Sequence, residues 1–193
     1  MSPRSSQQLA RMREETREKI LGTALQLFAR RGFHGASIGE IARQAGLSKG
    51  LAYHYFESKQ AILEAIIEEG FAEIERMMTV ALDVEDPHQK LVVLLERTFA
   101  VTEQDSEFWR VFTGLILQPD IWEGFQQRFM KFFEGVIGSF VDLFASLGFE
   151  DPRAEALLFA TTLDGIMLHF ILDQPEYPLE QVKNGLIRRY QKR

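Results

Sequence analysis

Residues 37–56 read SIGEIARQAGLSKGLAYHYF, and this stretch decides the fold. Ser37 and Glu40 have the S-x-x-E spacing of a capping box, which predicts that a short helix begins after Ser37. Gly46 can adopt the positive φ of a sharp turn, and Ser48 is a favourable N-cap for a second short helix. Two short helices joined by a tight, glycine-containing turn are the layout of a helix-turn-helix.

The polar residues of this stretch suggest what its surface binds. No acidic residue lies between positions 45 and 56, and Gly50 sits inside the second helix at a cost of about 1 kcal/mol relative to alanine. Lys49 and Lys59 fall in first turns of predicted helices, where the helix dipole disfavours a cation. A phosphate lying across both helix starts would reverse that penalty. The alternative is a helical hairpin whose polar face is only solvated.

The stretch from Thr16 to Leu63 resembles the DNA-binding domain of the TetR/AcrR family of bacterial transcriptional regulators. Ala52 departs from the pattern, because members more often carry a larger aliphatic residue there. The resemblance rests on Ala24, Leu27, Phe28, Gly32, Phe33, Ile41, Ala42, Ala45, Gly46, Ser48, Lys49, Gly50, Tyr53, His54, Tyr55, Phe56, Ser58 and Lys59.

The resemblance implies specific roles on DNA. Lys49, Gly50 and Tyr53 would face the major groove, with Lys49 as the direct reader of bases. Phosphates would be held by Ser37, Tyr53, His54 and Lys59. The full set of expected DNA-binding residues is Ser37, Ser48, Lys49, Gly50, Tyr53, His54 and Lys59.

The rest of the chain also has helical patterning, so the fold class expected is all-α with about nine helices. Apolar residues step by three and four through Phe125, Phe129, Phe132, Val136, Phe140, Leu143 and Leu147. We expect a helix-turn-helix DNA-binding domain over residues 1–60 and a helical effector-binding and dimerisation domain over residues 61–193. Only the first dozen residues look disordered.

Residues 108–149 contain 11 aromatic side chains. They could form a bulky core, or line a pocket that is poor in polar groups. The resemblance implies that this region binds a small effector, and the aromatic content favours an apolar or aromatic one. Expected lining residues are Trp109, Phe112, Leu115, Trp122, Phe129, Phe133 and Phe170, with His169 as either a pocket anchor or a core histidine bonded to a carbonyl. No cofactor or metal site is expected, because Asp164 and His169 are five residues apart.

The last two predicted helices resemble the dimerisation pair of the family. Four such helices from two copies would form a bundle. Alternatively, these faces cover only the core of their own chain. The expected interface residues are Ala156, Ala160, Gly165, Leu168, Leu179, Val182, Leu186 and Tyr190.

Composition narrows the compartment and the class of protein. The 193 residues include no cysteine, which excludes thiol catalysis and disulfides. The N-terminus has no apolar signal segment. No stretch is expected to reach the roughly 18 apolar residues of a membrane helix, because the best candidate, 135–149, is interrupted by Asp142 and several Gly and Ser. No nucleophile–base set, phosphate-binding loop or HExxH motif is present, so we expect a cytoplasmic protein that is not an enzyme.

The net charge of −6 conceals a division along the chain. Residues 1–60 contain ten Lys and Arg against five Asp and Glu, whereas residues 61–193 contain twelve against 23. This division fits a basic DNA-binding part on an acidic body. Together with it, the resemblance implies a ligand-responsive regulator, a repressor that binds a near-palindromic DNA operator as a homodimer and is released by an apolar or aromatic effector. The alternatives are an activator of the same family, or a helical ligand-binding protein without DNA regulation.

Overall fold

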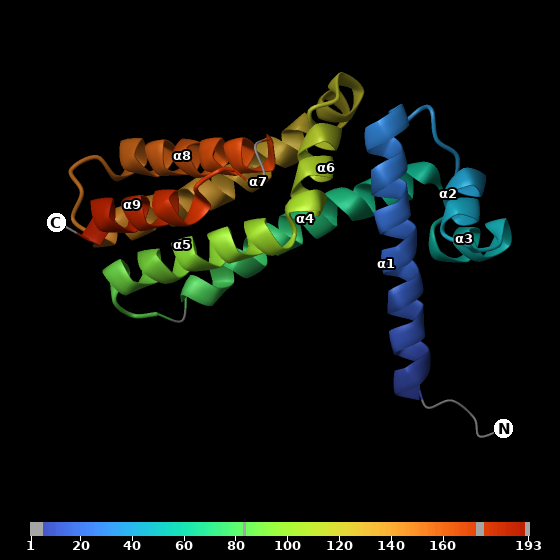
Figure 1. The fold of residues 1–193 in the computed structure, drawn as a ribbon, viewed down its shortest axis with the longest axis horizontal. Helices are drawn as coiled ribbons and strands as arrows, with labels where there is room; N and C mark the ends of the chain where they lie inside the picture. Colours follow the sequence, from blue (N-terminus) through green and yellow to red (C-terminus); the bar gives the residue numbers. More distant parts are fainter. Residues whose placement is uncertain (1–5, 83, 173–175, 192–193) are drawn as a thin grey trace. The chain divides into compact units, whose positions relative to one another are not determined.

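The computed structural model describes residues 6–82, 84–172 and 176–191. Over these residues the chain is all-α, as predicted (Figure 1). The described helices number nine, which also agrees with the prediction. They are α1 (Ser6–Arg31), α2 (Ile38–Gln44), α3 (Lys49–Tyr55), α4 (Lys59–Leu82), α5 (Pro87–Gln104), α6 (Ser106–Ile116), α7 (Pro119–Ser146), α8 (Pro152–Leu172) and α9 (Leu179–Gln191).

The predicted disorder of the first dozen residues is wrong from Ser6 onward, because α1 already begins there. Residues 7–15 of α1 are all exposed, so no buried apolar stripe predicts this part of the helix from the sequence. Ion pairs along the helix support them instead: Arg11 lies 2.8 Å from Glu15, and Arg17 lies 3.4 Å from Glu14. Such (i, i+3) and (i, i+4) pairs each stabilise a helix by about 0.2–0.5 kcal/mol.

The chain divides into two compact units. Unit 1 consists of the residues up to Gly70 together with Val111–Ile121. In this unit α2 packs on both α1 and α3, and each of the four N-terminal helices has buried apolar side chains. Its fully buried side chains include Ile20, Ala24, Phe28, Ile41, Ala52, Ile62 and Ile67.

Unit 2 consists of Phe71–Arg110 and the residues from Trp122 onward. In this unit α9 packs on α5 and α8. The rings of Phe144, Phe159 and Tyr190 meet in its core, with centroids 5.4 to 5.6 Å apart. The Tyr190 hydroxyl donates a hydrogen bond of 2.8 Å to Glu155.

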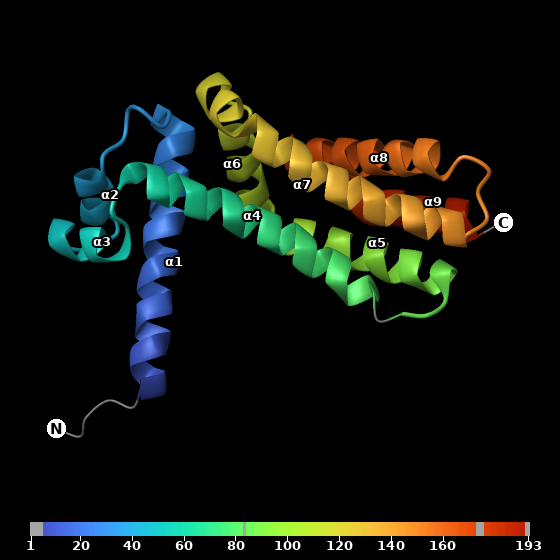
Figure 2. The same cartoon turned by 180° about the vertical axis from the view of Figure 1, so that it is seen from behind.

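Helix α4 belongs to both units. It runs without interruption from Lys59 to Leu82 (Figure 2). Residues 59–70 belong to unit 1 and residues 71–82 to unit 2. The predicted functional boundary after residue 60 thus falls at the start of this helix and remains a prediction.

Helix α8 is the one described helix that is long and apolar enough to cross a membrane by length and composition. The prediction that the chain has no stretch of this kind is therefore wrong for α8, because it took residues 135–149 as the best candidate. Ala156, Phe159 and Phe170 of α8 are buried in unit 2, but only 22% of the apolar window is buried.

Candidate nucleic-acid interface and ligand cavity

The turn between α2 and α3 has the predicted capping and backbone geometry. The Ser37 Oγ accepts a hydrogen bond of 3.3 Å from the amide of Glu40, as the capping box predicts. The Glu40 carboxylate, however, pairs with Arg31 of α1, so this side chain ties α2 to α1 instead of completing the box. Gly46 adopts a φ of 66°, which confirms the turn.

Helix α3 and its N-cap expose several polar side chains. Ser48 caps it, accepting a 3.1 Å hydrogen bond from the Leu51 amide. The Nζ of Lys49 lies 5.8 Å from the centre of the Tyr53 ring. The stem of Lys49 passes over Gly39, since a Cβ placed there would lie 3.6 Å from the Lys49 Cδ. Six of the seven predicted DNA-binding residues are exposed: Ser37, Ser48, Lys49, Gly50, Tyr53 and His54.

Gly50 has no intramolecular reason to be glycine. Its φ is not positive, and a Cβ added to it would meet no heavy atom within 4 Å. The cost of glycine inside a helix is therefore not offset by packing within the chain. The open space at this position lies on the same short helix as Lys49 and Tyr53.

Lys59 is the exception among the predicted DNA-binding residues. Its ammonium donates hydrogen bonds of 2.6 Å to the Phe33 carbonyl and 2.9 Å to the Ala36 carbonyl. It also lies 4.4 Å from the centre of the Phe33 ring. The lysine that appeared to oppose the helix dipole is thus satisfied by the loop before α2, and its geometry supports a positioning role instead of the predicted phosphate contact.

Two basic residues near the turn were not predicted. The side chain of Arg43 on α2 is 73% exposed. The Nζ of Lys19 on α1 would lie 3.8 Å from a Cβ placed on Gly46. The sequence showed an excess of Lys and Arg in the first 60 residues, but this excess did not indicate that Lys19 and Arg43 lie near the turn.

A cavity of about 290 Å³ lies inside unit 2. It is lined by side chains from α4, α5, α6, α7 and α8, most of them apolar. Asp164 is the one ionisable side chain among the described lining residues, and burial raises its pKa. The polar lining is completed by Thr98, Thr102 and Thr161.

The threonine hydroxyls of the cavity are oriented by their own helices. Thr102 Oγ1 donates a 2.8 Å hydrogen bond to the Thr98 carbonyl, and Thr161 Oγ1 donates one of the same length to the Leu157 carbonyl. Because each hydroxyl proton is used in this way, each oxygen retains lone pairs that can accept a hydrogen bond. The cavity wall therefore offers acceptors at Asp164 and at these two threonines.

Only two of the predicted ligand-binding residues, Trp109 and Phe133, line this cavity. Phe112 and Leu115 are buried in unit 1. Phe129 is fully buried and stacks on Trp122 with ring centroids 5.7 Å apart.

The other two ligand candidates lie near the end of α8. Phe170 is buried in the core of unit 2. His169 is exposed and stacks its ring parallel to Tyr177 at 6.3 Å, so it is neither a core histidine nor a lining residue. From the sequence, Asp164 was considered as a metal ligand or as a residue of an enzyme, and its place in the cavity wall was not predicted.

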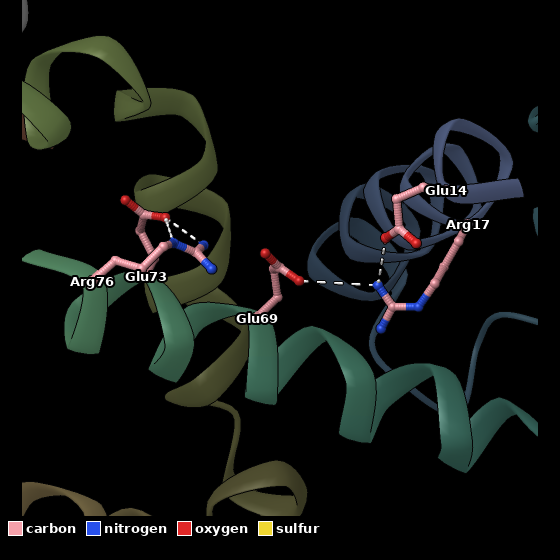
Figure 3. A network of polar contacts seen from close by, with 5 residues as sticks. All are labelled: Glu14, Arg17, Glu69, Glu73 and Arg76. Carbon is pink, nitrogen blue, oxygen red and sulfur yellow. Dashed lines mark hydrogen bonds and ion pairs between the residues drawn. The ribbon is translucent and has the colours of Figure 1, made fainter. Parts of the chain in front are cut away.

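Side chains of α4 make contacts within each of the two units. In unit 1, Arg17 of α1 lies 4.0 Å from Glu69 of α4 (Figure 3). One turn later, Glu73 accepts a 2.8 Å hydrogen bond from Nε of Arg76 (Figure 3). From the same stretch of α4, Ile74, Met77 and Met78 line the cavity of unit 2.

The predicted dimer residues have mixed environments. Ala156, Leu179, Leu186 and Tyr190 are buried in the core of their own chain. Ala160, Gly165 and Val182 are half-buried, and Leu168 is 45% exposed. The most exposed large apolar side chains of α8 were not predicted: Leu158 at 61% and Leu172 at 74%.

Comparison with known proteins identifies the N-terminal part. Residues 20–66 match the family model described as bacterial regulatory proteins, tetR family. The chain is 28% identical over 111 residues to the HTH-type transcriptional regulator YdgC of Bacillus subtilis, covering 55% of this chain and 56% of the relative. It is 30% identical over 131 residues to the regulator YvdT of the same species, covering 62% and 64%. The matches thus cover 56% of the length of YdgC and 64% of the length of YvdT, less than two thirds of either.

Solved structures share the fold over nearly the whole chain. One is AibR in complex with isovaleryl coenzyme A and operator DNA, which has a TM-score of 0.63 and 21% identity and covers 89% of this chain and 96% of that one.

Proposed function

Since residues 20–66 belong to the tetR family of bacterial regulatory proteins, we propose that the chain is a ligand-responsive transcriptional regulator. In this proposal α2 and α3 bind duplex DNA, the cavity of unit 2 binds a small effector, and effector binding lowers the affinity for DNA. The action proposed is repression, in the cytoplasm and without catalysis. Loss of repression in a reporter strain when the gene is deleted would agree with it, whereas loss of expression would indicate an activator.

The surface of α3 is the observation that carries this proposal. It combines an exposed cation at Lys49, an exposed aromatic hydroxyl at Tyr53 and an open backbone at Gly50. No acidic residue lies between positions 45 and 56 to repel a phosphate. A Lys side chain at the start of a helix in the major groove can donate to guanine, while Tyr53, His54 and the neighbouring Arg43 can contact the backbone.

A second copy of the chain would complete the interface. Leu158, Leu168 and Leu172 form an exposed apolar strip on α8, spaced by ten and four residues. Covering that strip with its two-fold mate would remove it from water. A two-fold dimer would also present two recognition helices to a near-palindromic site, with half-site centres about 34–36 Å or a multiple apart.

Helix α4 would couple the effector to the DNA-binding surface. Its residues Met77 and Met78 line the cavity, and the preceding turns of the same helix pack in the core of unit 1. A ligand can shift the protein toward the form that does not bind DNA only if it binds that form more tightly. The similar structure of AibR supports a role that joins a small ligand to DNA, because AibR was crystallised with both a coenzyme A ester and operator DNA.

The experiment that tests the proposed function is selection of bound duplexes from random-sequence DNA, followed by titration of the selected duplex. We expect a near-palindromic consensus and an affinity that falls steeply with salt. A protein with no retention of any duplex at low salt would refute DNA binding, whatever the cavity binds.

A further inference from the structure

The cavity of unit 2 carries a charge that a purely apolar ligand would not use. Asp164 reaches into a wall that is otherwise made of apolar side chains and threonines, and no Lys, Arg or His is among the described lining residues. Asp164 is exposed as a residue, but partial desolvation raises the pKa of its carboxyl group, and no cationic side chain lines the cavity beside it. A bound cation would supply the missing partner and favour the ionised form.

The aromatic side chains around the cavity suit the same kind of ligand. Trp109, Phe133 and Phe140 all line it, and the faces of aromatic rings attract cations by about 0.5–2 kcal/mol each. Thr102 and Thr161 can accept hydrogen bonds from an N–H group, as described above. The surrounding domain is also acidic, since residues 61–193 contain 23 Asp and Glu against 12 Lys and Arg. These features favour a cation over a neutral or anionic molecule.

We propose that the effector is a small apolar or aromatic molecule carrying a protonated amine, which is paired with Asp164 while its apolar body fills the space between the aromatic rings. The volume of about 290 Å³ is near the lower limit for small-molecule sites, so the molecule is compact. The coenzyme A part of a thioester such as that bound to AibR carries several phosphates, and this cavity offers no cationic side chain to hold them. That this molecule acts as an effector rests on the proposed function, whereas the preference of the cavity for a protonated amine does not.

The test compares three compounds that share one ring system and differ in charge: tryptamine, tryptophol and indoleacetate. Isothermal titration of the full chain, without DNA, measures their affinities at neutral pH. We expect tryptamine to bind most tightly and indoleacetate most weakly. The order should repeat with phenethylamine, phenethyl alcohol and phenylacetate. Tighter binding of the carboxylates, or no binding of any of the six compounds at millimolar concentration, would overturn the proposal.

A variant then assigns the preference to one residue. Asp164→Asn should weaken tryptamine about tenfold or more, because it removes a charge-assisted contact, and should change tryptophol by about twofold or less. Asp142→Asn on α7 is the matched control, since it removes the same charge from an exposed position of unit 2 that does not line the cavity. Equal affinity of the wild type and Asp164→Asn for tryptamine would overturn the assignment. Because DNA is absent, amine binding can succeed or fail independently of DNA binding.

Discussion

The ring of Phe112 on α6 occupies the space that a side chain at Gly70 of α4 would need. A Cβ added to Gly70 would lie 2.6 Å from the Phe112 Cε2 and closer still to Cζ, which is nearer than Cβ atoms approach other heavy atoms. Both residues are buried in unit 1. Gly70 lies one turn before Ile74, the first residue of α4 that lines the cavity. The close packing of Phe112 on Gly70 therefore lies next to the cavity-lining part of α4.

The first prediction concerns this contact. Gly70→Ala should destabilise the protein by about 1–3 kcal/mol, because the methyl group overpacks a buried ring. Denaturant unfolding followed by circular dichroism measures the change. Gly22→Ala is the control, since nothing lies within 4 Å of a Cβ there and a helix-interior alanine is favoured by about 0.5–1 kcal/mol. Adding Phe112→Leu to Gly70→Ala should recover part of the loss. Equal stability of the two single variants would show that the contact is not tight.

The second prediction separates folding from DNA binding at Gly50. Gly50→Ala should raise the free energy of unfolding by about 0.5–1 kcal/mol, because it improves helix propensity in open space. The same methyl group should weaken binding to the selected duplex, since it stands on the proposed DNA-facing surface. Fluorescence anisotropy measures the affinity, and Gly22→Ala provides a stabilised variant that should bind DNA normally. A Gly50→Ala protein with wild-type affinity would remove this residue from the interface.

The third prediction distinguishes two lysines. Lys49→Ala should change which bases are preferred, at a cost of about 1–3 kcal/mol at one position of the site. Lys59→Ala should instead lower the stability of the protein by about 1–3 kcal/mol, because the Phe33 and Ala36 carbonyls lose a charged donor. Binding-site selection and denaturant unfolding measure the two effects. An unchanged base preference for Lys49→Ala, or an unchanged unfolding curve for Lys59→Ala, would contradict the respective role.

The difference between these lysines illustrates what could be predicted from the sequence. Local signals were sufficient for the caps at Ser37 and Ser48 and for the turn at Gly46, because each depends on residues a few positions apart. The partner of Lys59 lies 26 residues earlier, so its first-turn position alone suggested a free cation. The fold class followed from periodicity in the same local way.

The cavity was predicted less well than the helix-turn-helix, for a physical reason. Aromatic spacing shows that a residue faces inward, but it does not distinguish a filled core from the wall of a void. Phe129 and Phe170 therefore belong to packed cores, whereas Trp109 and Phe133 line the cavity. Asp164 also lines the cavity, and its position as an acid within an apolar run was the sequence feature that was not used to predict this.

The fourth prediction uses the pH dependence of Tyr190. Burial of the phenol raises its pKa above the usual value near 10, and the hydrogen bond to Glu155 is the second largest cause. The folded state disfavours the phenolate, so the stability due to this group is complete below about pH 10 and is lost as the pH rises above it. Tyr190→Phe should cost about 1 kcal/mol at neutral pH and should reduce the decline in stability above pH 10. Unfolding curves of both proteins from pH 7 to 11 measure this, and parallel declines would contradict it.

The most direct test of the central proposal is the affinity of the full chain for its selected duplex, measured by fluorescence anisotropy with and without saturating tryptamine. We predict tight, salt-dependent binding to a near-palindrome, and an affinity about fivefold or more lower when the amine is bound. Binding that is unchanged by an amine shown to occupy the cavity would contradict coupling between the two units, and no binding to any duplex would contradict the DNA-binding role itself.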